Sequence, residues 1–423
     1  MDSAIVRALS PAPEQITLPD ALSRAQRVQP TAVQATGTLR NADAQQRSAY
    51  GSFLPTITAS GGAGSQFSEG SGRVDGNGNL VAPDRTTASL NMGLNGSLEL
   101  WTGLRRGADI SSAKATELSA EAGITNAKFQ VQLQTSQAYL DALAAKQTVA
   151  VRISSVRRAL EQLKVSMAKL RAGSTTRSDS LRSEVNLGNA RIQLINAEIQ
   201  QATAEASLGR LIGATGRVEA IDDTTYYAVQ GIDTTGLRAE ALANSPQVQT
   251  AEANAEVARA QVRTAYAAYS PTLSLNGNYT FSGNSESFET NPLYNNRSLS
   301  LQLNWPLFNK FQREQTVVNR DVARDNAEAT AADARRQVDA GMTQRLVELV
   351  AARARIMITT SSVLAATEDL RVTGERYRLG AATIVDLLTS QEALTQAEVD
   401  AVNARFDYLR AKAQLEALIG RSL

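Results

Sequence analysis

Apolar residues recur along the chain with two different periods, one typical of helices and one typical of strands. Steps of three and four residues run through two long segments without proline, 84–245 and 307–423. Such steps place apolar side chains on one helix face, and proline is excluded from helix interiors. One clear seam consists of Val149, Ile153, Val156, Leu160, Leu163, Met167 and Leu170. Both segments are therefore predicted to form long helices that pack along other helices as coiled coils.

Four shorter segments alternate apolar and polar residues instead, which is the period of a β-strand. They lie at about 54–68, 87–101, 271–283 and 297–308. The first two are joined by a loop rich in Gly, Asn and Ser, and so are the last two. The pattern therefore predicts two hairpins.

The polar face of these strands carries Ser, Thr, Asn and Gln with almost no charge. A sheet that covers the core of a soluble protein usually exposes charged side chains to solvent. A neutral polar lumen opposite an apolar, lipid-facing row is typical of a transmembrane barrel, whose interfaces carry aromatic residues. The residues expected at those interfaces are Trp101, Tyr279, Phe281 and Trp305. The strands alone leave a soluble β-sandwich open as the alternative.

The second half of the chain repeats the first. The interval from Pro30 to Pro55 recurs from Pro246 to Pro271, and the Leu-Ile-Gly of 211–213 recurs at 418–420. Each repeat therefore predicts a helix, two strands, a very long helix, a turn and a return helix. The expected divisions are an N-terminal extension at 1–14, a first repeat at 15–216 with helices at about 104–171 and 176–213, an equatorial linker at 217–236, and a second repeat at 237–423 with helices at about 311–378 and 383–420.

The number of strands requires several copies of the chain. Four strands are too few to close a membrane barrel, for which about eight is the smallest number. Unpaired strand edges are not tolerated in lipid, because their backbone groups would lack hydrogen bonds. The chain is therefore predicted to contribute its strands to a barrel that identical copies share.

Composition argues against most enzyme and nucleic-acid functions. The 43 basic and 42 acidic residues nearly cancel, and there is no histidine or cysteine. The chain therefore lacks imidazole bases, thiolate nucleophiles and the commonest metal ligands, so no catalytic site, cofactor or metal is expected. No uninterrupted apolar stretch of about 18 residues predicts a transmembrane helix. The start lacks the pattern of a secretory signal, which leaves open whether one was removed or never existed.

Several motifs resemble the TolC family of outer-membrane factors. The segment 299–308, ending in Trp-Pro-Leu-Phe, is similar to the family's last strand. Tyr-Arg-Leu-Gly at 377–380, followed by Thr-Ile-Val-Asp-Leu-Leu at 383–388, is similar to its second helix-turn-helix tip, and 170–181 resembles the weaker first tip. The resemblance covers roughly residues 15–423. The first repeat departs from the pattern at Ser97, where Pro306 stands in the second.

The resemblance implies a mainly α-helical protomer with a β-barrel part. Three chains would form a barrel of about twelve strands in the Gram-negative outer membrane and an α-helical tube across the periplasm. The implied partners are two further copies, outer-membrane lipid, a periplasmic adaptor and an inner-membrane pump of the RND or ABC type. The implied function is an exit duct, with multidrug efflux favoured over protein secretion. A non-channel coiled-coil surface scaffold is the alternative from another class.

The resemblance also implies a gate at the lower end of the tube. Asp386 would line the closed entrance, and Asp179 and Tyr377 would tether neighbouring coils. Thr389 and Ala382 stand where a second aspartate and a tethering arginine are usual, so the gate chemistry is expected to differ. The remaining arginines that could act as tethers are Arg177, Arg376 and Arg378.

Adaptor docking is implied for the two tips. The residues concerned are Leu170, Arg171, Gly173, Arg378, Leu379 and Gly380. Each of these roles has a plain structural alternative. The glycines serve as turn residues in any helical hairpin, because glycine accepts a positive φ. Asp179 and Asp386 each lie where a carboxylate is favoured at the N-terminus of a helix.

Overall fold

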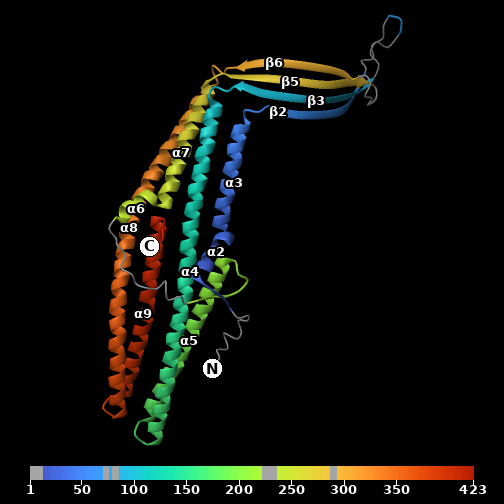
Figure 1. Cartoon of the computed structure of the whole chain (residues 1–423). Helices are drawn as coiled ribbons and strands as arrows, with labels where there is room; N and C mark the ends of the chain where they lie inside the picture. The colour runs from blue at the N-terminus through green and yellow to red at the C-terminus, as the bar shows by residue number, and fades with distance from the viewer. Residues whose placement is uncertain (1–12, 70–75, 79–84, 222–235, 286–292) are drawn as a thin grey trace. The chain divides into compact units, whose positions relative to one another are not determined.

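The computed structural model describes residues 13–69, 76–78, 85–221, 236–285 and 293–423 (Figure 1). The first half contains β1 (Glu14–Ile16), α2 (Leu18–Val28), α3 (Pro30–Gly51), β2 (Thr56–Ser68), β3 (Arg85–Trp101), α4 (Arg105–Arg171), α5 (Arg177–Ile212) and β4 (Val218–Ala220). The second half contains α6 (Leu237–Asn244), α7 (Pro246–Tyr266), the 3₁₀ helix η2 (Ala267–Tyr269), β5 (Thr272–Ser285), β6 (Tyr294–Asn304), α8 (Gln312–Arg378) and α9 (Ile384–Ile419).

The two halves repeat one another element by element. The order α3, β2, β3, α4, α5 recurs as α7, β5, β6, α8, α9. The long helices α4 and α8 have 67 residues each, and the return helices α5 and α9 have 36 each. A mainly helical tandem-repeat protomer with a small sheet, as the sequence predicts, is therefore confirmed.

The return helices begin and end with the same local chemistry. Each starts at a threonine N-cap whose hydroxyl accepts from the backbone N–H of an aspartate in the first turn, and that aspartate accepts in return from the cap N–H. This reciprocal capping box satisfies backbone donors that the helix leaves free. Gly213 and Gly420 end the two helices with φ of 73° and 85°, a conformation that disfavours other residues.

The four long strands form one antiparallel sheet in the order β2-β3-β5-β6. The register pairs Thr56 with Ser97 and Thr272 with Asn304, and a β-bulge between Glu99 and Trp101 interrupts β3 near its helix end. Among the described residues, β2 pairs only with β3 and β6 pairs only with β5. Both outer strands therefore keep one edge that no other strand of the described part of the chain pairs with.

An arginine joins the end of each hairpin to the helix that follows it. Arg313 donates to two backbone carbonyls just after β6, at 2.6 and 3.0 Å, and its guanidinium lies 4.7 Å from the centre of the Tyr269 ring. Arg106 likewise donates to the carbonyl of Glu99 and lies 4.8 Å from the Phe53 ring. The turn from strand to long helix is thus held in the same way in both repeats.

The chain divides into two compact units, each described by itself. The first comprises the described residues within 1–39, 120–252 and 330–423, and the second comprises those within 40–119 and 253–329. The first contains the main apolar core, whose largest fully buried side chains are Tyr139, Leu143, Leu208, Met342, Phe406, Leu415 and Ile419. Beside this core β1 and β4 pair in parallel. The second unit holds the four-stranded sheet and the helix ends next to it.

Parts of three sequence-based expectations lie outside the described residues. They are most of the N-terminal extension (1–12), most of the equatorial linker (222–235) and parts of both hairpin loops (70–75, 79–84 and 286–292).

Within the described chain, α8 contains an 18-residue window of mean hydropathy 1.3, with 11% of it buried. By length and composition this window could cross a membrane, contrary to the expectation of no such helix. A single window of this kind is weak evidence for a span.

Candidate functional site

The two helix-turn-helix tips share one backbone design. Gly173 and Gly380 adopt φ of 70° and 78°, and no atom would lie within 4 Å of a Cβ added at either. The requirement for glycine here therefore comes from the backbone conformation and not from crowding. Each tip closes with a backbone bond across the turn, Ser174 N to Lys169 O at 2.9 Å and Ala381 N to Arg376 O at 2.8 Å.

Asp179 and Asp386, two predicted gate residues, both cap their helices. Asp179 accepts from the Thr175 hydroxyl at 2.7 Å and from the Thr176 N–H at 3.3 Å. Asp386 accepts from the N–H and the hydroxyl of Thr383 at 2.9 and 2.8 Å. These bonds favour the ionised carboxylates, so the pKa of each lies below its usual value, chiefly through the Thr175 hydroxyl for Asp179 and the Thr383 N–H for Asp386.

Tyr377 lies in an apolar cluster at the second tip. Its side chain is 6% exposed and packs with Ile384 and Leu387, against which Leu370, Ala382 and Leu388 are also packed. Its buried phenol oxygen has no hydrogen-bond partner among the described residues. The structure therefore does not join Tyr377 to Asp179 within one chain, and a tether between copies stays a prediction.

Lys169, which the sequence analysis did not single out, joins the first tip to the second. Its ammonium donates to the Tyr377 carbonyl at 2.6 Å and lies 4.1 Å from the centre of the Tyr377 ring. Both contacts favour a positive charge at this point. They connect the last turn of α4 to the last turn of α8, within one compact unit.

The predicted docking residues project from the tips. Arg171, Arg378 and Leu379 are exposed, Leu379 to 84%, whereas Leu170 is half-buried. Of the arginines considered as tethers, Arg376 donates to the Ala381 carbonyl at 3.3 Å and Arg378 pairs with Glu375 at 3.3 Å, while Arg177 is exposed on the first turn of α5. The two paired arginines thus serve their own tip within a single chain.

Thr389 is exposed on α9 and faces a groove between α5 and α9. The groove, with a volume of about 620 Å³, is lined on α9 by Val385, Leu388, Thr389 and Glu392. On α5 it is lined by Ser178, Leu181, Arg182, Val185, Asn186 and Asn189. The predicted gate residues Asp386 and Tyr377 do not line it.

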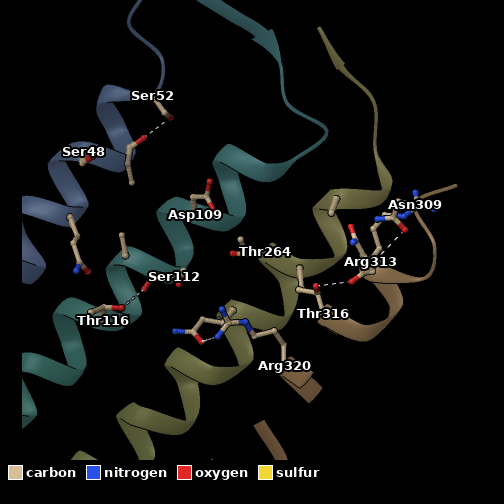
Figure 2. A pocket seen from close by; sticks show the side chains of 17 residues that line it. Ser48, Ser52, Asp109, Ser112, Thr116, Thr264, Asn309, Arg313, Thr316 and Arg320 are labelled. Carbon is tan, nitrogen blue, oxygen red and sulfur yellow. Dashed lines mark hydrogen bonds between the residues drawn. The ribbon is translucent and has the colours of Figure 1, made fainter. Parts of the chain in front are cut away.

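A second candidate surface lies in the other unit, where residues of four helices and their ends line a mostly polar concavity of about 920 Å³ (Figure 2). Each helix turns small or polar side chains toward it. The polar ones are Gln45, Ser48, Ser52, Asp109, Ser112, Thr116, Gln261, Thr264, Asn309, Gln312, Arg313, Thr316 and Arg320. Thr116 and Thr316 donate to carbonyls of their own helices, and Arg320 donates to Gln261 at 2.9 Å. Such a wall can hydrogen-bond water but holds few free charges.

The predicted interface aromatics fall at both ends of the sheet. Trp101 and Trp305 lie at the helix end, both more than half exposed, and the Trp305 indole donates to the Tyr269 carbonyl at 3.2 Å. Tyr279 and Phe281 lie toward the loop end, with their rings edge to face at 4.9 Å. Their assignment to membrane interfaces stays a prediction.

Sequence reasoning missed contacts that join distant parts of the chain. Nothing in the local pattern marks Lys169, because its partner lies 208 residues away. The hairpin arginines did leave a signal, since Arg106 and Arg313 each follow a strand end and Phe53 and Tyr269 each stand two residues before a proline. The described residues contain no group of three or more His, Cys, Asp or Glu suited to a metal.

Comparison with known proteins gives a consistent picture. The family profile described as outer membrane efflux protein matches residues 20–214 and 237–421. The chain is 25% identical over 314 residues to the alkaline protease secretion protein AprF of Pseudomonas aeruginosa, covering 71% of this chain but 64% of AprF. It is 26% identical over 405 residues to the pyoverdine export outer membrane protein OpmQ of the same species, covering 91% and 81%.

The fold matches solved structures along nearly the whole chain. The crystal structure of the outer membrane protein VceC from Vibrio cholerae superposes with a TM-score of 0.76 at 18% identity, covering 96% of both chains. At this identity the likeness concerns the fold alone. Because the family profile matches nearly all of both repeats, the chain belongs to the outer membrane efflux protein family.

Proposed function

We propose that this chain is one subunit of a passive, trimeric exit duct that is gated at its helix tips and recruited by a periplasmic adaptor and an inner-membrane pump. Family membership assigns the chain to the outer membrane of Gram-negative cells, with an extension into the periplasm. The proposal adds the number of copies, the gate and the partners.

The observation that carries the proposal is the incompleteness of the sheet. Its apolar row is exposed on the single chain, including Leu299, Leu301 and Leu303, and the edges of β2 and β6 have no partner among the described residues. Moving an unpaired backbone N–H or C=O group from water into lipid would cost about 2–7 kcal/mol. Pairing β6 of one copy with β2 of the next removes both edges and encloses the polar row.

The polar concavity supports a water-filled passage. Its hydroxyl and amide groups can exchange hydrogen bonds with water or with a moving solute, and strong binding would impede release. No arrangement of nucleophile, base and oxyanion donor accompanies it among the described residues. A conduit therefore fits this surface better than a reaction site does.

The gate is proposed at the tips, where Asp386 and Thr389 would face the entrance of the trimer. A ring of like negative charges at a narrow entrance holds divalent cations, which obstruct the passage, and it repels anions. Replacing Asp386 with Ala should therefore raise the conductance of reconstituted trimers and weaken block by divalent cations. Thr383→Ala is the matched control, because it removes the capping hydroxyl but keeps the carboxylate. An unchanged conductance in Asp386→Ala would remove this residue from the gate.

Small-molecule efflux is the proposed cargo class, with protein secretion as the alternative. The similarity to the pyoverdine export protein extends over 405 residues, further than the 314 residues shared with the secretion protein. Export of a fluorescent drug and of a secreted protease can be compared in cells that lack their own duct. Restored protease secretion without restored drug efflux would favour the alternative.

The direct test of the duct is electrical. Purified chain in planar lipid bilayers should give discrete, ohmic conductance steps, and it should run as a trimer before heating. Soluble monomers without conductance would support the coiled-coil scaffold instead.

A further inference from the structure

One charged side chain lies on the apolar row of the sheet, toward its loop end. The outward row of β6 reads Asn295, Arg297, Leu299, Leu301 and Leu303 from the loop end, and Trp305 follows just beyond the strand. The register places Tyr279 opposite Arg297, and Leu94 opposite Tyr279 on the next strand. Among the described side chains of the four-stranded sheet, the other charged group is Glu99, which lies near the helix end in register with Ser274 of the polar row.

Arg297 lies over an aromatic ring and contacts no acidic side chain among the described residues. Its guanidinium lies 4.9 Å from the centre of the Tyr279 ring. It is exposed, and no other described residue forms a hydrogen bond or an ion pair with its guanidinium. The five N–H donors of a guanidinium form a planar fork that suits two oxygens of one phosphate. Stacking on Tyr279 restricts this fork and leaves its edge free for such a ligand.

The depth of Arg297 fits the outer boundary of the apolar band. From Arg297 to Trp305 the row extends about 26 Å at about 3.3 Å per residue. A strand tilt of about 40° reduces this to about 20 Å along the membrane normal, close to the apolar height of about 25 Å in barrels of this kind. Arginine stems can lie along apolar surface while the charged head reaches the polar boundary. Trp305 would mark the inner boundary and Arg297 the outer one.

We propose that Arg297 and Tyr279 form a binding site for the phosphate of a lipid headgroup in the outer leaflet. The proposal rests on the proposed function, which turns the apolar row toward lipid and the hairpin loops toward the cell exterior. A guanidinium that lipid partly removes from water needs a counter-charge. Lipid phosphate supplies one at this depth. The strand β2, which would lie beside β6 in the neighbouring copy, contains no acidic residue itself, and Glu69, which directly follows β2, is the protein carboxylate that would compete for Arg297.

The test measures lipid binding to the intact trimer. Full-length trimers in neutral detergent are titrated with bis-phosphorylated lipid A and with its dephosphorylated form, and bound lipid is counted by native mass spectrometry. The phosphorylated lipid should bind about tenfold more tightly than the dephosphorylated one, as a charge-assisted pair predicts. Arg297→Gln should remove this preference, and Arg297→Lys should keep most of it because the charge stays.

Control experiments test whether lipid binding depends on Arg297 itself, on the general surface charge or on another counter-charge. Arg336→Gln removes a charge from an exposed position on α8 and should leave lipid binding unchanged. Excess inorganic phosphate should not displace the lipid; if it does, the site takes free phosphate and the lipid assignment is wrong. If the lipid preference is absent from the wild-type trimer and appears only in Glu69→Gln, Arg297 pairs with Glu69 of a neighbouring copy and the proposal is wrong.

Equal binding of both lipids by the wild-type trimer, or an undiminished preference in Arg297→Gln, would overturn the proposal. Conductance of the same trimers is measured in parallel. Normal conductance without a lipid preference rejects the phosphate site alone, whereas absent trimers and absent conductance reject the proposed duct.

Discussion

The two hairpin tips have the same backbone but different interiors. In the register of the duplication, Gly173 matches Gly380 and Asp179 matches Asp386, and each pair has the same conformation or the same capping bonds. At the first tip, however, buried polar groups meet, with the hydroxyls of Ser166 and Ser183 at 2.8 Å and Gln162 donating to Ser166 at 3.1 Å. At the second tip the buried groups are Tyr377, Ile384 and Leu387.

This difference shows which parts of a duplicated hairpin are fixed by the turn. The cap and the glycine serve any helix reversal, so both copies keep them. The interior is free to diverge, because polar and apolar contacts can both close a short coil. Apolar burial stabilises more per side chain than an exchange of hydroxyl hydrogen bonds with water does. We therefore infer that the second tip is the firmer one and that Lys169 fastens the first tip to it.

Truncating the apolar interior should produce the largest effect. Leu387→Ala removes a buried side chain, 4% exposed, at a cost of about 2–5 kcal/mol for a leucine in a core. The matched control is Ser180→Ala, the position that corresponds to Leu387 in the first repeat. Local opening can be followed by amide hydrogen exchange of assembled trimers. Similar changes at the two tips would contradict the contrast between them.

The tip glycines should respond equally to substitution. Gly173→Val and Gly380→Val each force a β-branched residue into a positive φ, at a cost of about 1–3 kcal/mol, although space for the side chain exists. Trimers should still form in both variants. If Gly380 also docks the adaptor, Gly380→Val should abolish export and adaptor cross-linking. Loss of the trimer itself would make the residue purely structural.

Releasing the contact between the tips should have an intermediate effect. Lys169→Met keeps the length of the side chain but removes its bond to the Tyr377 carbonyl and its contact with the ring. Charged hydrogen bonds and exposed cation–π contacts together suggest about 1–2 kcal/mol after solvent screening. Hydrogen exchange should rise at the first tip more than at the second, and the open time of single channels should increase. The control is Lys164→Met, which removes a surface pair with Glu161 one turn away from the contact.

Acid should destabilise both tips, and this is the smallest of the expected effects. The pKa values of Asp179 and Asp386 are lowered from 3.8 by hydrogen bonds to the ionised form. Their contribution to stability is therefore fully present above about pH 3.8 and is lost as the pH falls through the lower folded values. Amide exchange, corrected for its intrinsic pH dependence, should increase below pH 3.8 at both tips. Asp386→Asn should remove this dependence at the second tip alone.

The sequence predicts much of the fold because its signals are local. Helix period, strand alternation, and the Thr-x-x-Asp caps after Gly173 and Gly380 all act within a few residues of the chain. The parallel pairing of β1 with β4 could not be foreseen as a register, because the partners are about two hundred residues apart and the strands have three residues each.

The sequence predicts where the candidate site lies better than it predicts the contacts that its side chains make. The tips follow from the glycines and the repeat, and both aspartates were expected at the N-termini of helices. The buried state of Tyr377 and its contact with Lys169 depend on how α4 and α8 pack, which no spacing rule specifies. The contact of Arg297 with Tyr279 was not predictable either, because only the strand register places the two residues opposite each other.

Joining the two free strand edges tests the central claim most directly. The chain has no cysteine, so Gln66→Cys on β2 and Ser300→Cys on β6 introduce one thiol at each edge strand. In the register of the duplication these positions match Ser282 and Asn91, which pair directly across β5 and β3. Treatment of the double variant in outer membranes with a short bifunctional maleimide should give a covalently closed trimer on denaturing gels, whereas either single variant should stay uncoupled. A product of monomer size, in which β2 and β6 of one chain are joined to each other, would contradict a barrel shared among copies.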